Sequence, residues 1–164
     1  SGTYVASNPG VADDPLGFTF IDDKQRLARD LLEVRFMIEP QMASMAAEHA
    51  TNDQVVCIKE LCDESERLAE AGEDYSAADT AFHNAIAESS GNLVVPRLMG
   101  VFKASVPLFI DVTGKKLVEE TIRTHRDVAD AIASRNPTAA HDAMYLHLVY
   151  NRNMIAEGAE AKGI

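Results

Sequence analysis

Apolar residues recur at intervals of three and four along most of the chain, which is the spacing of amphipathic helices rather than strands. The clearest run predicts a first helix over about residues 23–49, with apolar positions at Leu27, Leu31, Val34, Ile38, Met42, Met45 and Ala46. Pro40 lies inside this run, and it removes one backbone donor. We therefore expect a kink or a split in this helix near Glu39.

Capping residues divide the next stretch into two helices. Thr51-Asn52-Asp53 offers N-cap side chains to a second helix that ends at Gly72. Tyr75-Ser76 opens a third, which stops at Ser89-Ser90-Gly91. Each boundary combines a polar capping residue or a glycine with the start or end of an apolar pattern.

Three further helices follow in the C-terminal half. A fourth begins at Asn92, with Pro96 in its first turn, and continues to Phe109 with Pro107 bending its end. A fifth spans about residues 115–135, and Asn136-Pro137-Thr138 caps a sixth that runs to about Glu157. No strand pattern follows residue 6, and no internal repeat is visible. The sequence predicts an all-α domain of six or seven helices.

Composition narrows the class of protein. The 164 residues suffice for one domain. Residues 1–20 are rich in Gly, Pro, Ser and Asp and show no helical periodicity, so this segment is expected to form a linker. The formal charge of −11 would repel nucleic-acid phosphates, so this chain is not expected to bind DNA by itself. No apolar run approaches the length of about 20 residues needed to span a bilayer, and we expect a cytoplasmic setting.

The two cysteines, Cys57 and Cys62, are five positions apart, which places them on different helix faces and matches no zinc or redox motif. We expect both to be buried, reduced thiols.

The chemically distinctive residues are one aspartate and three histidines. Asp79 and His83 are four residues apart and share one face of the third helix. His125 and His147 are flanked by apolar residues and are expected to face inward. Each alone is explained as a core histidine, but four such groups would be costly to bury unpaired, whereas one shared cation would satisfy them all. This donor set suits zinc, nickel, manganese or iron.

Arg35 lies close to the apolar face of the first helix, where a guanidinium needs an anionic partner. Two explanations remain open: an ion pair with Glu39 at i+4, or a grip on the carboxylate of a ligand. Thr121 and Asn151 each stand four residues from one of the expected metal histidines, so they are placed near the same cavity. His49 and His141 are expected at solvent-exposed positions and are excluded from the site.

Several short motifs carry a resemblance to a known family. They are Glu33-Val34-Arg35, Ile38-Glu39-Pro40, Met45-Ala46-Ala47, Asp79 with Phe82-His83, Ser90-Gly91-Asn92, His125 with Ala131-Ile132, and Ala143-Met144 with His147-Leu148. In this order and spacing, over about residues 24–157, the chain resembles the C-terminal effector domain (FCD type) of GntR-family, FadR-like bacterial transcription regulators.

The resemblance implies an antiparallel helical bundle around a central pocket. It implies that Asp79, His83, His125 and His147 bind a divalent metal and that Arg35 holds the carboxylate of a small organic acid effector. Thr121 occupies a position that often faces the effector in such domains.

The resemblance also gives a domain organisation. Residues 1–21 would be a linker with a remnant of the wing strand of a missing winged helix-turn-helix domain, because Ser1–Ala6 looks like the last strand of such a wing. Residues 22–164 would be the effector-binding and dimerisation domain of a homodimer, which contacts DNA only through the missing N-terminal part.

Alternatives from other classes stay open at this point. A metal-dependent all-α hydrolase would use the same open metal site, and His141-Asp142 is a pair of the type seen in helical phosphohydrolases. No obvious general base accompanies the four ligands, however, and no Glu-x-x-His of a di-iron bundle occurs in the sequence. A third possibility is a structural dimerisation module without a ligand. The favoured prediction is a non-enzymatic sensor.

Overall fold

The computed structural model describes residues 16–102 and 118–161 of the chain. These residues form six α-helices and one short 3-10 turn (η1, Phe18–Phe20), and no strand occurs among them. The helices are α1 (Lys24–His49), α2 (Asn52–Glu70), α3 (Ser76–Ser89), α4 (Val95–Phe102), α6 (Val118–Ala133) and α7 (Pro137–Ala161). The all-α prediction is confirmed. The expected wing strand, the bend at Pro107 and the segment up to Phe109 lie outside the described residues.

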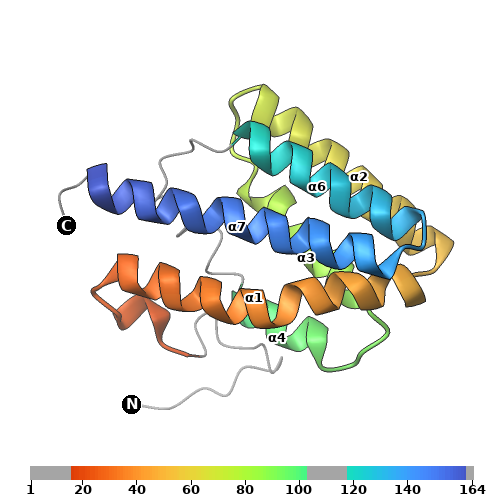
Figure 1. Ribbon diagram of the computed structural model, residues 1–164, viewed down its shortest axis with the longest axis horizontal. Coiled ribbons are helices and arrows are strands. Elements are labelled where there is room, and N and C mark those ends of the chain that lie inside the picture. Colours follow the sequence, from red (N-terminus) through yellow and green to blue (C-terminus); the bar gives the residue numbers. More distant parts are fainter. Residues whose placement is uncertain (1–15, 103–117, 162–164) are drawn as a thin grey trace, which may run out of the picture.

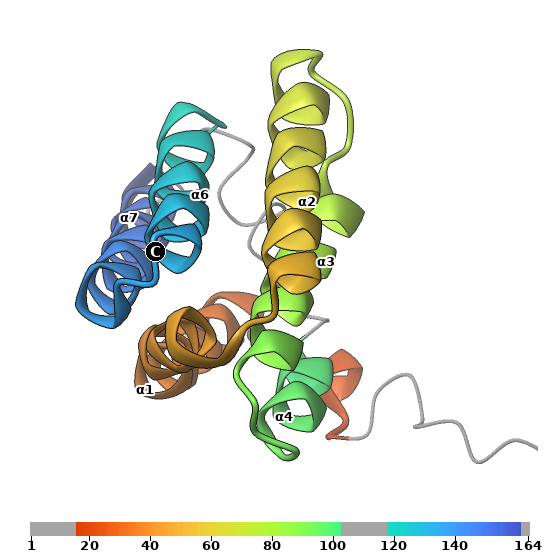
Figure 2. The same ribbon diagram turned by 90° about the vertical axis from the view of Figure 1, so that its right-hand side faces the viewer.

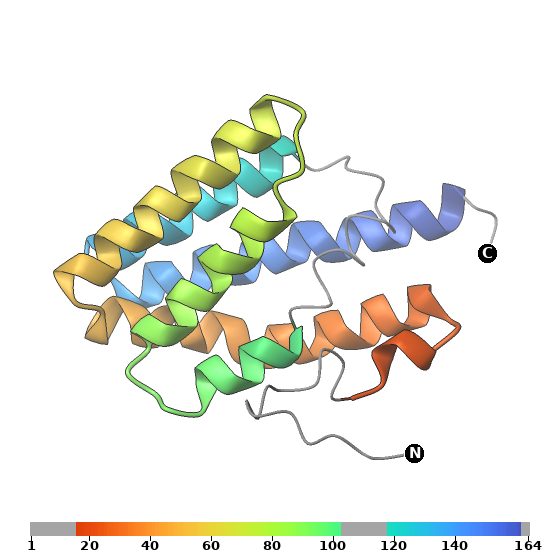
Figure 3. The same ribbon diagram turned by 180° about the vertical axis from the view of Figure 1, so that it is seen from behind.

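The helices pack as an antiparallel bundle. The long helices α1 and α7 run side by side in opposite directions along the length of the molecule (Figure 1). Helix α6 packs beside α7, and α2 packs against both α6 and α3 (Figure 2). Seen from behind, α3 crosses the bundle in front of α1 and α7, and α4 packs against its end (Figure 3). Helices α1, α3, α6 and α7 therefore converge near the centre of the bundle.

Local capping explains most helix boundaries. The Thr51 hydroxyl accepts a hydrogen bond from the Gln54 backbone N–H, and the Gln54 side chain accepts one from the Thr51 N–H, which is a complete capping box for α2. The Asn92 side chain accepts from the N–H groups of Val94 and Val95 at the start of α4. The cap at Thr51 was predicted from the sequence, whereas Asn92 was predicted as the first residue of the fourth helix, which begins three residues later at Val95.

Pro40 does not split the first helix. Helix α1 continues without a break from Lys24 to His49, with Pro40 buried inside it. Tertiary packing overrides the local cost of the missing donor, because Met42, Ala43, Ala46 and Ala47 on the following turns are buried in the core. The predicted split is therefore wrong, whereas its alternative, a kink, stays a prediction.

The core is built from aliphatic residues of all the helices around one aromatic ring. Phe82 on α3 is fully buried, and it packs with Ile58, Ile86, Val128, Ile132 and Met144 in one cluster. This fixes the rotation of α3 about its axis. None of the helices within the described ranges has the length and apolar character needed to cross a membrane.

The cysteine prediction is half right. Cys62 is buried, and burial raises the pKa of its thiol to about 11. Cys57 is exposed, because it lies on the solvent-facing side of α2. The expectation that both thiols are buried is corrected for Cys57. The different faces follow from the five-residue spacing.

Candidate metal and ligand site

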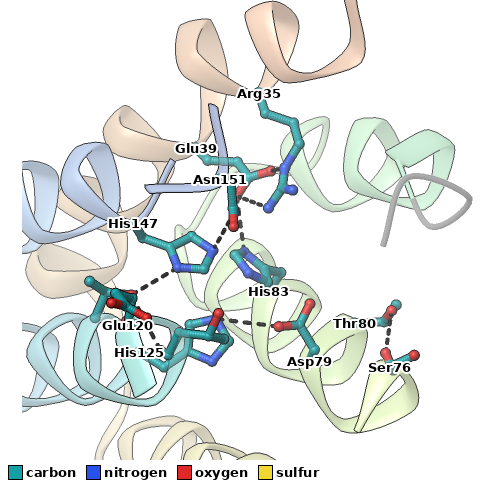
Figure 4. Close-up of polar contacts among 12 residues, drawn as sticks. Arg35, Glu39, Ser76, Asp79, Thr80, His83, Glu120, His125, His147 and Asn151 are labelled. Atoms are coloured by element: carbon teal, nitrogen blue, oxygen red, sulfur yellow. Dashed lines mark hydrogen bonds and ion pairs between the residues drawn. The ribbon is translucent and has the colours of Figure 1, made fainter. Parts of the chain in front are cut away.

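Three histidines from three helices meet where the bundle converges. His83 on α3, His125 on α6 and His147 on α7 are each at most 3% exposed. One ring nitrogen from each lies within 4.8 Å of the other two, and the three rings face one another (Figure 4). Their ring centroids are 4.6–5.4 Å apart. The sequence predicted this convergence of residues that are 42 and 22 positions apart.

Several nitrogens in this group lack a hydrogen-bond partner. Both ring nitrogens of His83 and the Nε2 atom of His125 are buried without one. Burial is the main reason that the pKa values of His125 and His147 lie well below the ordinary value for histidine; the neighbouring histidines and Arg35 lower them further. These two imidazoles are therefore neutral, and a neutral imidazole has the lone pair that a metal needs.

Asp79 lies beside this group rather than between its members. Its Oδ1 atom is 3.4 Å from Nε2 of His125, and the side chain is buried. Burial raises its pKa, and the positive groups His83 and Arg35 partly oppose that effect. Its role as the fourth ligand stays a prediction.

A buried ion pair borders the histidines on the α1 side. The Arg35 guanidinium donates two hydrogen bonds to the Glu39 carboxylate, one from Nε and one of 3.1 Å from Nη2. Glu39 is completely buried, and its Oε2 atom is 2.9 Å from Nδ1 of His83. That contact is close enough for an ion pair but lacks hydrogen-bond alignment. Burial alone would raise the pKa of Glu39, but Arg35 and His83 outweigh it and hold that pKa well below its ordinary value.

The structure resolves part of the question about Arg35. Arg35 forms the ion pair with Glu39 that was one of the two explanations for a guanidinium near the apolar face of this helix. Nothing in this contact excludes an additional ligand carboxylate, and that role stays a prediction. The first helix thus brings a fixed charge pair next to the three buried histidines.

The other predicted ligand residues lie on the same two helices as His125 and His147. Asn151 is half-buried on α7, with its Nδ2 atom 3.2 Å from Nε2 of His147. Thr121 is buried on α6, one turn before His125. Their roles toward an effector are untested predictions. His49 is exposed and His141 pairs at the surface with Asp142, so neither contributes to the buried group.

Sequence reasoning missed two residues of the site. Glu39 was considered only as a partner of Arg35, because nothing in the sequence relates it to His83, 44 positions away. Thr124 was not considered at all, yet its Oγ1 atom is 3.0 Å from Nδ1 of His147. The signal that could have identified Thr124 is its place directly before a suspected ligand, His125, although this adjacency does not relate it to His147.

The residues fit a bound divalent metal. The donor set consists of three buried imidazoles with a neighbouring carboxylate, which is the ligand chemistry of zinc, nickel and iron sites. Three of the six ring nitrogens have no aligned hydrogen bond, so they are available to a cation.

Comparison with known proteins identifies the class. The FCD domain family matches residues 30–150. LutR, an HTH-type transcriptional regulator of Bacillus subtilis, is 30% identical over 158 residues, covering 90% of this chain and 70% of LutR. The HTH-type transcriptional repressor NanR of Salmonella newport is 26% identical over 151 residues, covering 82% of this chain and 57% of NanR. A solved structure described as Streptococcus agalactiae GntR has a TM-score of 0.80 at 36% identity, covering 93% of this chain and 71% of that one.

These likenesses settle the family. The chain belongs to the FCD domain family, the effector-binding domains of GntR-type transcription regulators, as the sequence resemblance predicted. It spans between 56% and 70% of the length of LutR, NanR and YcbG, a further HTH-type transcriptional regulator of Bacillus subtilis. These relatives are transcription regulators, in agreement with the prediction that the domain is not an enzyme.

Proposed function

We propose that this domain is a metal-dependent sensor of a small organic acid. A divalent ion would bind His83, His125 and His147, with Asp79 as the fourth ligand. The metal and Arg35 together would then hold the carboxylate of the effector. Zinc, nickel, manganese and iron all suit such a donor set, and the choice among them is left to measurement.

The observation that carries this proposal is the set of orphaned nitrogens. Three buried ring nitrogens on His83 and His125 have no hydrogen-bond partner, although a buried polar atom without one costs about 1–3 kcal/mol. One cation between the three rings would satisfy one nitrogen of each at once. A purely structural dimerisation module gives no reason to keep such unpaired atoms.

The proposed effector chemistry follows from the charges around the metal position. Arg35 supplies a rigid guanidinium that can grip a carboxylate, and Asn151 on α7 and Thr121 on α6 supply neutral hydrogen-bonding groups. Three histidines and one aspartate leave one or two metal positions for oxygen atoms of the effector. A carboxylate with a neighbouring hydroxyl would match this arrangement.

The metal would also link the helices that an effector must move. His83, His125 and His147 come from α3, α6 and α7, and Glu39 connects the same point to α1. An effector that alters the metal coordination therefore acts on four helices at one position. In the whole regulator, a homodimer would transmit this change to DNA through a winged helix-turn-helix domain that precedes residue 22.

A hydrolase is less well supported by the geometry. The His141–Asp142 pair that suggested one lies at the surface of α7, with side chains 41% and 71% exposed. Neither residue belongs to the buried histidine group, so the pair offers no base beside the proposed metal.

The test is metal analysis of the purified domain. We expect about one divalent ion per chain by elemental analysis, and a rise in melting temperature when zinc or nickel is added to the stripped protein. A ligand at 100 times its Kd stabilises the folded state by about 2.7 kcal/mol. His125→Ala should abolish this rise, whereas His141→Ala, which alters a surface histidine, should retain it. An equal response of both variants, or no bound metal, would contradict the sensor.

The effector can be sought in the metal-loaded protein. A thermal-shift screen of small mono-, di- and hydroxycarboxylates should reveal a stabilising acid, and the shift should disappear after chelation of the metal. Retention of the full shift without metal would show that the acid does not bind through the ion.

A further inference from the structure

We infer that Thr124 is a positioning residue that fixes the tautomer of His147, and that Asn151 holds the ring nitrogen that the metal will take. This inference rests on the proposed metal site. Thr124 would act before the metal arrives, by setting the position of the ring proton, and Asn151 would act when the metal binds, by giving up its hydrogen bond to the ring.

The first step concerns the single proton of the Thr124 hydroxyl. Its Oγ1 atom is 2.7 Å from the Glu120 backbone carbonyl and 3.2 Å from the Thr121 carbonyl, and carbonyl oxygens can only accept hydrogen bonds. If the proton pointed elsewhere, two oxygens would lie 2.7 Å apart without a proton between them. The hydroxyl therefore donates along its own helix to Glu120, as threonines in helices often do.

The second step follows at the ring of His147. Nδ1 is 3.0 Å from Thr124 Oγ1, whose proton is already committed, so the hydroxyl can only accept from this nitrogen. Nδ1 therefore carries the hydrogen of the neutral imidazole, and Nε2 carries the lone pair. Thr124 and His147 are 1% and 3% exposed, so solvent does not offer an alternative partner at this contact.

The third step determines the orientation of Asn151. Its side-chain amide lies 3.2 Å from Nε2 of His147. A nitrogen with a lone pair needs a donor, so the Asn151 NH₂ group, not its oxygen, faces the ring. The chain of hydrogen bonds thus runs from Asn151 through His147 and Thr124 to the Glu120 carbonyl, across helices α7 and α6. Figure 4 shows the contact between Asn151 and His147 and the position of Glu120 on the neighbouring helix.

This chain defines what must happen when a metal binds. Nε2 of His147 has one lone pair, and a metal bound there displaces the Asn151 amide. The Nδ1–H bond to Thr124 is kept, because it lies on the far side of the ring. Thr124 thus prepares the nitrogen for the metal, while Asn151 competes with the metal and is released next to the effector position.

The tautomer can be measured without any metal. Nitrogen-15 and carbon-13 chemical shifts of the histidine rings in the stripped protein should show His147 with its proton on Nδ1. In Thr124→Val the acceptor is lost while the shape is kept, so Asn151 can rotate, accept with its oxygen, and move the proton to Nε2. Thr124→Ser should restore the Nδ1–H form.

A matched control is available on α3. Thr80 donates to the Ser76 carbonyl at 2.8 Å, which is the same bond within a helix, but its hydroxyl contacts none of the three histidines. Thr80→Val should leave the His147 tautomer unchanged. An Nε2–H proton in the native protein, or no change in Thr124→Val, would overturn the role of Thr124.

Metal affinity then tests both residues together. Zinc titration against a competing chelator should show about 10- to 100-fold weaker binding for Thr124→Val, and near-native binding for Thr124→Ser and Thr80→Val. Asn151→Ala should bind zinc as tightly as the native protein or more tightly. Weaker binding by Asn151→Ala would overturn its role as a competitor. If the native protein bound no metal, the proposed function would fail, while the ring shifts would still decide the tautomer.

Discussion

Two polar clusters of this domain solve the problem of burying charge in opposite ways. At the centre, the side chains of Arg35, Glu39 and the three histidines are withdrawn from water. Between α2 and α6, Arg126 pairs with Asp63 and Glu66, and its side chain remains 37% exposed. The outer cluster has a protein partner for every charge, and water reaches all of them. In the inner cluster three ring nitrogens lack an aligned hydrogen bond, although Nδ1 of His83 lies 2.9 Å from Glu39 and Nε2 of His125 lies 3.4 Å from Asp79.

The difference indicates which cluster exists for a ligand. Solvated ion pairs contribute little to stability and tolerate change, because water replaces a lost partner. Buried polar atoms without an aligned hydrogen bond are costly, as are buried charges that are not compensated. The inner cluster is therefore the one for which we propose a ligand, whereas the outer pairs are explained by packing α2 against α6.

The largest contrast is expected from removing one carboxylate from each cluster. Glu39→Gln leaves the buried Arg35 with a weakened partner and should lower the free energy of unfolding by about 3–5 kcal/mol. Glu66→Gln, at a side chain 29% exposed, should cost less than about 1 kcal/mol. Urea denaturation of both variants without metal measures the difference. Equal costs would show that the two clusters are not distinguished by burial.

A second prediction concerns the ring that holds the inner cluster in place. Phe82 is fully buried, with its centroid 4.5 Å from that of His125 and 5.6 Å from that of His83. Phe82→Ala should cost about 3 kcal/mol or more and loosen the histidines, and the milder Phe82→Leu about 1–2 kcal/mol. Both should weaken zinc binding without loss of a ligand, because the rotation of α3 is no longer fixed.

The control for this variant is a core residue away from the histidine rings. Ile58 on α2 is equally buried, and Ile58→Val should cost about 0.5–1.5 kcal/mol with zinc affinity unchanged. Unchanged zinc affinity in Phe82→Leu as well would mean that the ring contributes to stability but does not orient the ligands.

The same contrast explains how far the sequence could lead. Helix boundaries depend on neighbouring residues, so the Thr51 cap could be predicted from the chain alone. The i,i+4 relation of Asp79 and His83 is also local. The distant His125 and His147 were predicted from their apolar flanks and the cost of burying them unpaired, and the family resemblance then named the same residues as ligands. The split expected at Pro40 does not occur, because the burial of the following turns of α1 in the core outweighs the cost of the missing backbone donor. Such tertiary packing cannot be seen in the sequence.

The missed residues depend on contacts between helices. Glu39 meets His83 from another helix, and Thr124 meets His147 across α6 and α7. Neither pair has a characteristic spacing, since helix packing alone brings them together. Cys57 depends on helix packing in the same way. Its five-residue offset from Cys62 predicted that the two cysteines lie on different helix faces, but only the packing of α2 shows that the face of Cys57 is exposed to solvent.

The smallest effect is expected in the outer cluster. Arg126→Gln removes hydrogen bonds to both Asp63 and Glu66, but the carboxylates left behind are hydrated, so the loss should be at most about 1 kcal/mol. In about 1 M salt, where the screening length falls to about 3 Å, the difference from the native protein should shrink further. Zinc affinity should stay native, because the Arg126 side chain pairs with Asp63 and Glu66 and not with the three histidines.

The control is Arg67→Gln, because Arg67 is hydrogen-bonded to Glu64 on its own helix and does not join α2 to α6. A salt-insensitive loss in Arg126→Gln larger than that of Glu39→Gln would reverse the assignment of the two clusters.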